Sequence, residues 1–122
     1  MAVRVLLVED SDVYRTSLEL LLDMQPGIEV VGGVASGAEA LAACGALRPE
    51  VVLMDLRLPG AGGVAATADL LEAFPGTSVV CLTAEAMPDE RQAITAAGAT
   101  AIVEKGQPIE TLVAAIVAAA AG

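Results

Sequence analysis

Residues 51–55 read Val-Val-Leu-Met-Asp, an apolar run that ends on a carboxylate. A second run of the same kind, Val3–Val8, is followed directly by Glu9 and Asp10. In strands with one solvent-exposed face, polar and apolar residues alternate, whereas strands that are buried on both faces of a parallel sheet are apolar almost throughout. The two runs therefore predict central strands of a parallel sheet, with acidic residues at their carboxyl ends.

The rest of the chain alternates between β-branched runs and helix-like segments, separated by glycines and prolines. The five predicted strands are Val3–Val8, Ile28–Val34, Val51–Met54, Ser78–Leu82 and Ala101–Val103. The five predicted helices are Asp12–Met24, Gly37–Leu47, Gly63–Phe74, Pro88–Ala97 and Ile109–Ala120. We expect Ser36 and Glu39 to form a capping box, and Asp12 to cap the first helix.

Strict alternation of strand and helix indicates an α/β fold with helices on both faces of a parallel sheet. We expect a (βα)5, doubly wound, five-stranded sheet of the flavodoxin-like kind, with strand order 2-1-3-4-5. The chain has 122 residues, which fits one compact domain over residues 1–122.

Composition excludes several functions. The net charge is −10, so the domain is repelled by nucleic acid and by anionic membrane surfaces. The sequence has no histidine, which removes His-dependent catalysis, His-ligated zinc and a phosphohistidine on this chain. Cys44 and Cys81 are expected to be structural. No apolar stretch approaches the roughly 20 residues of a membrane helix, and no secretory signal is visible, so a cytoplasmic location is expected.

Polar residues follow four of the predicted strands. Glu9 and Asp10 follow the first, Asp55 the third, Thr83 the fourth, and Lys105 comes shortly after the fifth. In an open parallel sheet, ligands bind beyond the carboxyl ends of the strands. Because strands one and three are neighbours in the expected order, the three carboxylates should converge on one point.

Three carboxylates at one point repel each other, by about 4 kcal/mol for two charges about 4 Å apart at an effective dielectric of about 20. Mg²⁺ relieves such repulsion and prefers one or two carboxylates together with water and phosphate oxygens. We predict that Asp10 and Asp55 bind Mg²⁺ and that Glu9 acts partly through water. Asp55 is the predicted nucleophile, and the Thr83 hydroxyl and Lys105 ammonium are predicted to contact the phosphoryl group.

Four blocks of sequence resemble the signature of response regulator receiver domains, the CheY-like superfamily of two-component signalling. The blocks are Val5–Asp10, Leu53–Gly60, Leu82–Ala84 and Glu104-Lys105. The resemblance implies a signalling switch that accepts a phosphoryl group onto Asp55 from a sensor histidine kinase. It further implies that the backbone carbonyl of Arg57 completes the Mg²⁺ shell and that the Ala84 amide contacts the phosphoryl group.

The resemblance also bears on activity and partners. It implies a protein that catalyses only its own phosphorylation and dephosphorylation, rather than an enzyme with an external substrate. A homodimer is compatible with it, whereas direct contact of this domain with nucleic acid or membrane is not expected. We further hypothesise that Arg57 and Glu85 face each other over the site as an exposed ion pair, which restricts attacking water and changes the lifetime of the phosphoryl group.

Three positions depart from the family pattern. Ile102 stands where many receivers have an aromatic residue that moves inward with the threonine, Gly106 stands where a proline often follows the lysine, and Gly62 stands where Asp or Asn is common. The missing aromatic residue keeps a second interpretation open, a degenerate receiver that binds partners or dimerises without phosphorylation. A Mg²⁺-dependent phosphatase is a weaker alternative, because Arg57 replaces the second acid that such enzymes need. A flavin-binding relative is weaker still.

Overall fold

The computed structural model describes residues 2–122, so Met1 of the expected domain lies outside the described residues. Within this range strands and helices alternate as the sequence predicts. The strands are β1 (Val3–Val8), β2 (Ile28–Val34), β3 (Val51–Asp55), β4 (Ser78–Thr83) and β5 (Ala101–Glu104). The helices are α1 (Asp12–Asp23), α2 (Gly37–Leu47), α3 (Gly62–Ala73), α4 (Pro88–Ala96) and α5 (Ile109–Ala121).

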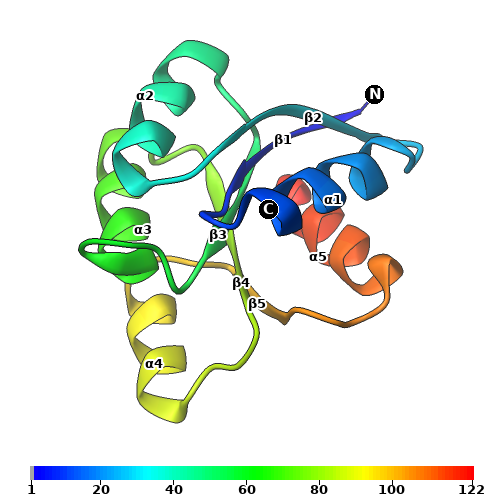
Figure 1. The fold of residues 1–122 in the computed structure, drawn as a ribbon. Coiled ribbons are helices and arrows are strands. Elements are labelled where there is room, and N and C mark those ends of the chain that lie inside the picture. The colour runs from blue at the N-terminus through cyan, green and yellow to red at the C-terminus, as the bar shows by residue number, and fades with distance from the viewer. Residues whose placement is uncertain (1) are drawn as a thin grey trace.

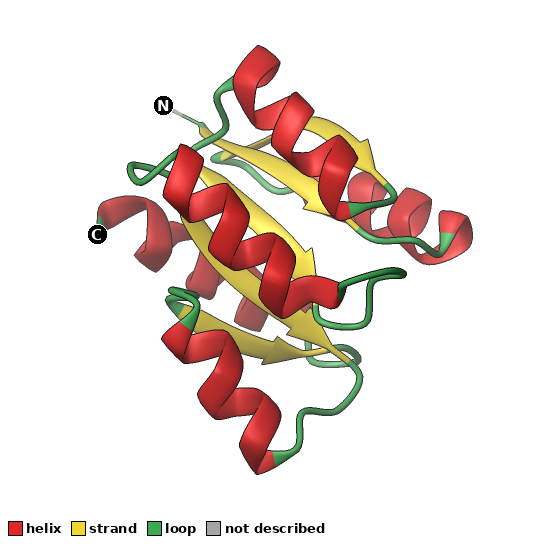
Figure 2. Ribbon diagram, turned by 90° about the vertical axis from the view of Figure 1, so that its left-hand side faces the viewer, coloured by secondary structure: helices red, strands yellow, loops and turns green. Residues whose placement is uncertain are grey.

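The strands form one parallel sheet in the order β2-β1-β3-β4-β5, which confirms the predicted fold class. All arrows point the same way, so the carboxyl ends of the strands share one edge (Figure 2). At that edge Val8 of β1 pairs with Met54 of β3, and Asp55 pairs with Leu82 of β4. Residues that follow these strands are therefore brought side by side.

Each face of the sheet is covered by helices and carries its own core. Helices α1 and α5 lie on one side, and α2, α3 and α4 lie on the other (Figure 1). The first core lies between the sheet and helices α1 and α5, and in it Leu7 of β1 packs with Leu22 and Ile116. The second core lies between the sheet and helices α2, α3 and α4, and in it Leu6 of β1 packs with Leu70. Successive side chains of a strand point to opposite faces, which explains why the central strands are apolar almost throughout.

Several element ends differ from the prediction by one residue. Strands β3, β4 and β5 each run one residue further, because Asp55 pairs with Leu82 and Thr83 pairs with Glu104. Two candidate site residues, Asp55 and Thr83, are thus the last residues of their strands. Their backbones are held by the sheet while their side chains stand at its edge.

The two predicted helix caps have different outcomes. Ser36 caps α2, where its Oγ accepts the Glu39 N–H at 3.2 Å. The Glu39 carboxylate in turn accepts from the Ala35 N–H and the Ser36 hydroxyl, so the returning bond lies one residue from its usual position. The prediction that Asp12 caps α1 is wrong, because Ser11 is the cap and its Oγ accepts the Tyr14 N–H at 3.3 Å.

The two cysteines are free and buried, so the structural interpretation of them is confirmed. Both lie in the second core, and burial is the main cause that raises the pKa of Cys81 to about 11. Over residues 2–122, every helix is too short or too polar to cross a bilayer.

Candidate functional site

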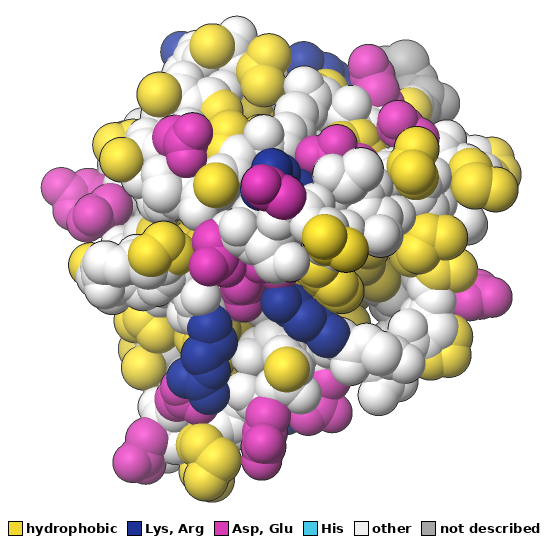
Figure 3. Space-filling view, viewed as in Figure 1, with side chains coloured by type: hydrophobic (Ala, Val, Ile, Leu, Met, Phe, Trp, Pro, Cys, Tyr) yellow, Lys and Arg dark blue, Asp and Glu magenta, His cyan; other side chains and the backbone are white. Residues whose placement is uncertain are grey.

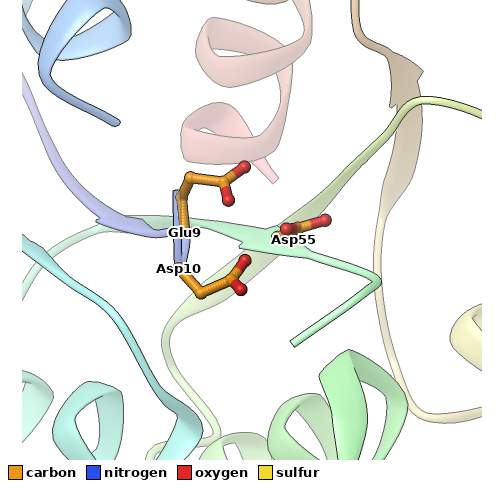
Figure 4. Close-up of side chains that lie close together, drawn as sticks. All are labelled: Glu9, Asp10 and Asp55. Atoms are coloured by element: carbon orange, nitrogen blue, oxygen red, sulfur yellow. The ribbon is translucent and has the colours of Figure 1, made fainter. Parts of the chain in front are cut away.

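The structure brings Glu9, Asp10 and Asp55 together at the carboxyl edge of the sheet. Each offers a carboxylate oxygen, and these oxygens lie within 4.8 Å of one another. Figure 4 shows that Glu9 and Asp10 come from the end of β1 and Asp55 from the adjacent end of β3. Glu9 and Asp55 are buried, whereas Asp10 is exposed. The cluster is therefore open to solvent on the Asp10 side and could hold a metal ion there.

The Glu9 carboxylate already has a partner for each oxygen. Its Oε1 lies 2.5 Å from Lys105 Nζ, and its Oε2 accepts the Ser11 N–H at 2.9 Å. Arg15 adds a bond to the Glu9 backbone carbonyl at 2.7 Å. By contrast, none of the ion pairs within the described part of the chain involves Asp10. This difference favours Asp10 over Glu9 as a direct metal ligand.

Lys105 lies between the carboxylates. Besides Glu9, its Nζ lies 3.6 Å from Asp55 Oδ2, and its backbone N–H donates to the Thr83 carbonyl at 2.7 Å. Desolvation lowers the pKa of Lys105, but the hydrogen bond to Glu9 and the nearby carboxylate charges outweigh it, so the pKa is raised. Lys105 is therefore an ammonium at neutral pH. Figure 3 shows acidic side chains gathered beside Lys and Arg side chains on this face.

Thr83 is fully buried at the end of β4. Its Oγ1 donates a hydrogen bond to the backbone carbonyl of Glu85 at 2.9 Å. The hydroxyl is thus engaged within its own loop, and it would have to leave Glu85 in order to donate to a phosphoryl oxygen.

Arg57 is tied to Asp55 and to α4. Its backbone N–H donates to Asp55 Oδ1 at 3.1 Å, while its guanidinium pairs with Glu90 at the start of α4 and donates to the Glu85 carbonyl at 3.3 Å. The hypothesis of an Arg57–Glu85 ion pair is therefore wrong, because only the backbone of Glu85 is contacted. The pairing lowers the pKa of Glu90, first through the hydrogen bond from Arg57.

The backbone conformation explains why glycine occupies positions 62 and 106, two of the departures from the family pattern. Gly106 has φ 92° and Gly62 has φ 86°, in a region that L side chains rarely adopt. Proline, with φ fixed near −65°, could not take the backbone position of Gly106. Gly62 also lies one residue before the predicted helix start, as the first residue of α3.

Ile102 is half-buried in β5 and packs against the second core. This placement agrees with simple packing of a β-branched residue in a strand. An aliphatic side chain that packs against the core thus stands where the resemblance would place an aromatic one.

Three further residues bear on the site and were missed from the sequence. The Tyr14 ring faces Lys105, whose Nζ lies 4.4 Å from the ring centroid, and Glu90 holds Arg57. A Cβ on Gly63 would lie 2.3 Å from the backbone oxygen of Asp55. The sequence predicted Gly63 only as the first residue of a helix. It did not indicate that Gly63 lies so close to the backbone of Asp55. The roles of the Arg57 carbonyl and the Ala84 amide stay predictions.

Comparison with known proteins agrees with this geometry. The family model for the response regulator receiver domain matches residues 5–117. Among curated relatives, the response regulator GacA of Pseudomonas viridiflava is 39% identical over 114 residues, which cover 93% of this chain and 53% of the relative. The chain thus spans about half the length of the curated GacA relatives that it matches.

Solved structures share the whole fold. A LuxR-family two-component response regulator from Aurantimonas sp. has a TM-score of 0.94 and 31% identity, covering 100% of this chain and 87% of that chain. The receiver domain of the putative response regulator NarL from Mycobacterium tuberculosis has a TM-score of 0.91 and 28% identity, covering 99% and 98%. The family match, the strand order and the acidic edge agree, and the chain belongs to the response regulator receiver domains of two-component systems.

Proposed function

We propose that this receiver domain is a switch that accepts a phosphoryl group on Asp55 from the phosphohistidine of a sensor histidine kinase. The observation that carries the proposal is the convergence of Glu9, Asp10 and Asp55 beside the Lys105 ammonium. Phosphoryl transfer needs mainly positioning and charge neutralisation, and this group of side chains supplies both.

In the proposed reaction an Oδ atom of Asp55 attacks phosphorus. The new O–P bond forms as the N–P bond of the phosphohistidine breaks, and the leaving imidazole nitrogen keeps the bonding electrons and takes up a proton. Lys105 lies 3.6 Å from Asp55 Oδ2 and is placed to face the added negative charge. The Thr83 hydroxyl would exchange the Glu85 carbonyl for a phosphoryl oxygen.

The donor set fits Mg²⁺, because carboxylate oxygens are the hard ligands that this ion prefers. Asp10, Asp55 and the backbone carbonyl of Arg57 would hold the ion, and Glu9 would act through water because its two oxygens are already bonded. The bound ion would neutralise negative charge on the phosphoryl oxygens.

The partners follow from the same chemistry. The donor would be a kinase histidine, since the chain has no histidine of its own. A DNA-binding or other output would lie outside this domain, whose net charge of −10 opposes contact with nucleic acid. Phosphorylation would change the surface that this domain offers to such a partner, or to a second copy of itself.

The test is incubation with acetyl phosphate and Mg²⁺, followed by intact mass. We expect one added phosphate on the wild type and on Asp69→Asn, a matched change at an exposed acid on α3. Asp55→Asn should gain none. Wild-type protein that stays at its unmodified mass would contradict the proposal.

One observation supports a second candidate, a receiver that binds partners without phosphorylation. Ile102 packs against the core where an aromatic switch residue is common. Sedimentation of the wild type with and without beryllofluoride, a phosphoryl mimic, separates the two functions. The switch predicts a change in self-association or in partner binding, and the degenerate receiver predicts none.

A further inference from the structure

The side chain of Lys105 is held by three contacts. Two are with carboxylates, Glu9 Oε1 at 2.5 Å and Asp55 Oδ2 at 3.6 Å. The third is with the face of the Tyr14 ring, whose centroid lies 4.4 Å from Nζ. A cation over an aromatic face is attracted by the ring quadrupole at such distances.

The two carboxylate contacts depend on the charge of the pocket, whereas the ring contact does not. A divalent cation shares the negative charge that attracts Lys105, and phosphorylation turns a carboxylate oxygen of Asp55 into the bridging oxygen of an acyl phosphate. The quadrupole of Tyr14 stays the same through both events. The contact with Asp55 thus changes during the reaction, whereas the contact with the Tyr14 ring stays and, together with Glu9, holds the ammonium in place.

Tyr14 is itself fixed by the acidic cluster. Glu9 Oε2 accepts the Ser11 N–H at 2.9 Å, and Ser11 Oγ accepts the Tyr14 N–H at 3.3 Å as the cap of α1. Together with the Tyr14–Lys105 and Lys105–Glu9 contacts, these bonds form a closed network of four residues, namely Glu9, Ser11, Tyr14 and Lys105. The first turn of α1 is therefore tied to the same carboxylate that pairs with the lysine.

A pocket of about 210 Å³ lies beside this four-residue network. Tyr14, Lys105, Leu18 and Leu82 are among the residues that line it. A lysine has a flexible four-carbon stem, so its ammonium could swing from Asp55 toward this pocket unless another group restrains it. The Tyr14 ring packs against the ammonium on the pocket side and provides that restraint.

We infer that Tyr14 is a positioning residue for Lys105, and that its ring face keeps the ammonium directed at the phosphoryl group on Asp55. The inference deepens the proposed function and rests on it. The ring carries the effect, so phenylalanine should replace tyrosine at this position and leucine should not.

The test compares wild type, Tyr14→Phe, Tyr14→Leu and Val13→Ala. Val13 is an exposed neighbour on the same turn of α1, which makes it a control for helix effects. The rate of phosphorylation by acetyl phosphate is followed by intact mass over a series of Mg²⁺ concentrations. In parallel, NMR of the unphosphorylated proteins records the ring-current shift of the Lys105 ε protons.

We expect Tyr14→Leu to slow phosphorylation about three- to tenfold at saturating Mg²⁺, with the Mg²⁺ midpoint unchanged. Tyr14→Phe and Val13→Ala should match the wild type. The upfield shift of the Lys105 ε protons should persist in Tyr14→Phe and vanish in Tyr14→Leu. If Tyr14→Leu does not fold, the shift in wild type and Tyr14→Phe still decides, because its absence there overturns the inference.

Other results separate the two proposals. A Tyr14→Leu rate equal to that of the wild type overturns the positioning role and leaves the proposed function standing. A Tyr14→Phe rate as slow as that of Tyr14→Leu overturns the role of the ring in favour of the hydroxyl. Wild-type protein that takes up no phosphate overturns the proposed function, and this inference with it.

Discussion

The tightest backbone constraint near Asp55 lies at Gly63, at the start of α3. A Cβ built there would lie 2.3 Å from the backbone oxygen of Asp55 and 2.8 Å from the Cα of Leu56. Both atoms belong to the backbone, so neither can rotate away as the end of a flexible side chain can. Gly63→Ala therefore forces α3 away from the segment that carries Asp55.

The cost can be worked from this geometry. Overpacking of a core costs typically about 1–3 kcal/mol, and a clash with backbone belongs at the upper end, about 3 kcal/mol. Alanine regains about 1 kcal/mol over glycine in a helix, so the net destabilisation is about 2 kcal/mol. For a chain of this size, that corresponds to a fall in Tm of roughly 8 °C.

Gly45→Ala in α2 is the matched control. A Cβ at Gly45 would lie 3.7 Å from the Phe74 ring, an ordinary contact, so this variant should be as stable as the wild type or more stable by up to about 1 kcal/mol. Thermal unfolding followed by circular dichroism measures both variants. A Gly63→Ala protein that melts within about 2 °C of the wild type would show that α3 accommodates the extra methyl group without a clash.

Two further predictions concern the first turns of helices. Ser36→Ala removes the side chain that accepts the Glu39 N–H, so it should lower the free energy of unfolding by about 1 kcal/mol in urea titrations; an unchanged midpoint would count against the cap. Arg57 lowers the pKa of Glu90 below its ordinary value of 4.5, so this pair stabilises the fold above that pH and loses its effect as pH falls through the lowered pKa. Glu90→Gln should therefore be less sensitive to acid than the wild type when Tm is measured from about pH 6 to about pH 3, and parallel Tm curves would contradict the pairing.

The fold could be predicted because the apolar, β-branched runs and their regular alternation with helix-like segments agreed along the whole chain. Apolar runs such as Val5–Val8 are buried on both faces in the structure, as expected of central parallel strands. The alternation with helices then left few topologies open. Element ends shifted by a residue because ladder pairing, not local composition, decides where a strand such as β3 ends.

The convergence of the three carboxylates could also be foreseen, because it depends only on strand order and on which residues follow the strands. The side-chain partners could not. Arg57 reaches Glu90 and not the side chain of Glu85, which depends on how α4 packs against the loop after β3. The Tyr14–Lys105 contact joins residues far apart in sequence, and no local pattern encodes it.

The fold gathers Glu9, Asp10 and Asp55 into one pocket, which we propose binds a divalent cation. The most direct measurement is Tm against Mg²⁺ concentration for wild type, Asp10→Asn and the exposed control Asp69→Asn. A ligand that binds only the folded state at about 100 times its Kd adds about 2.7 kcal/mol. Wild type and Asp69→Asn should therefore melt higher as Mg²⁺ is added, and Asp10→Asn should lose most of that rise. An Asp10→Asn protein that responds to Mg²⁺ as fully as the wild type would contradict the account.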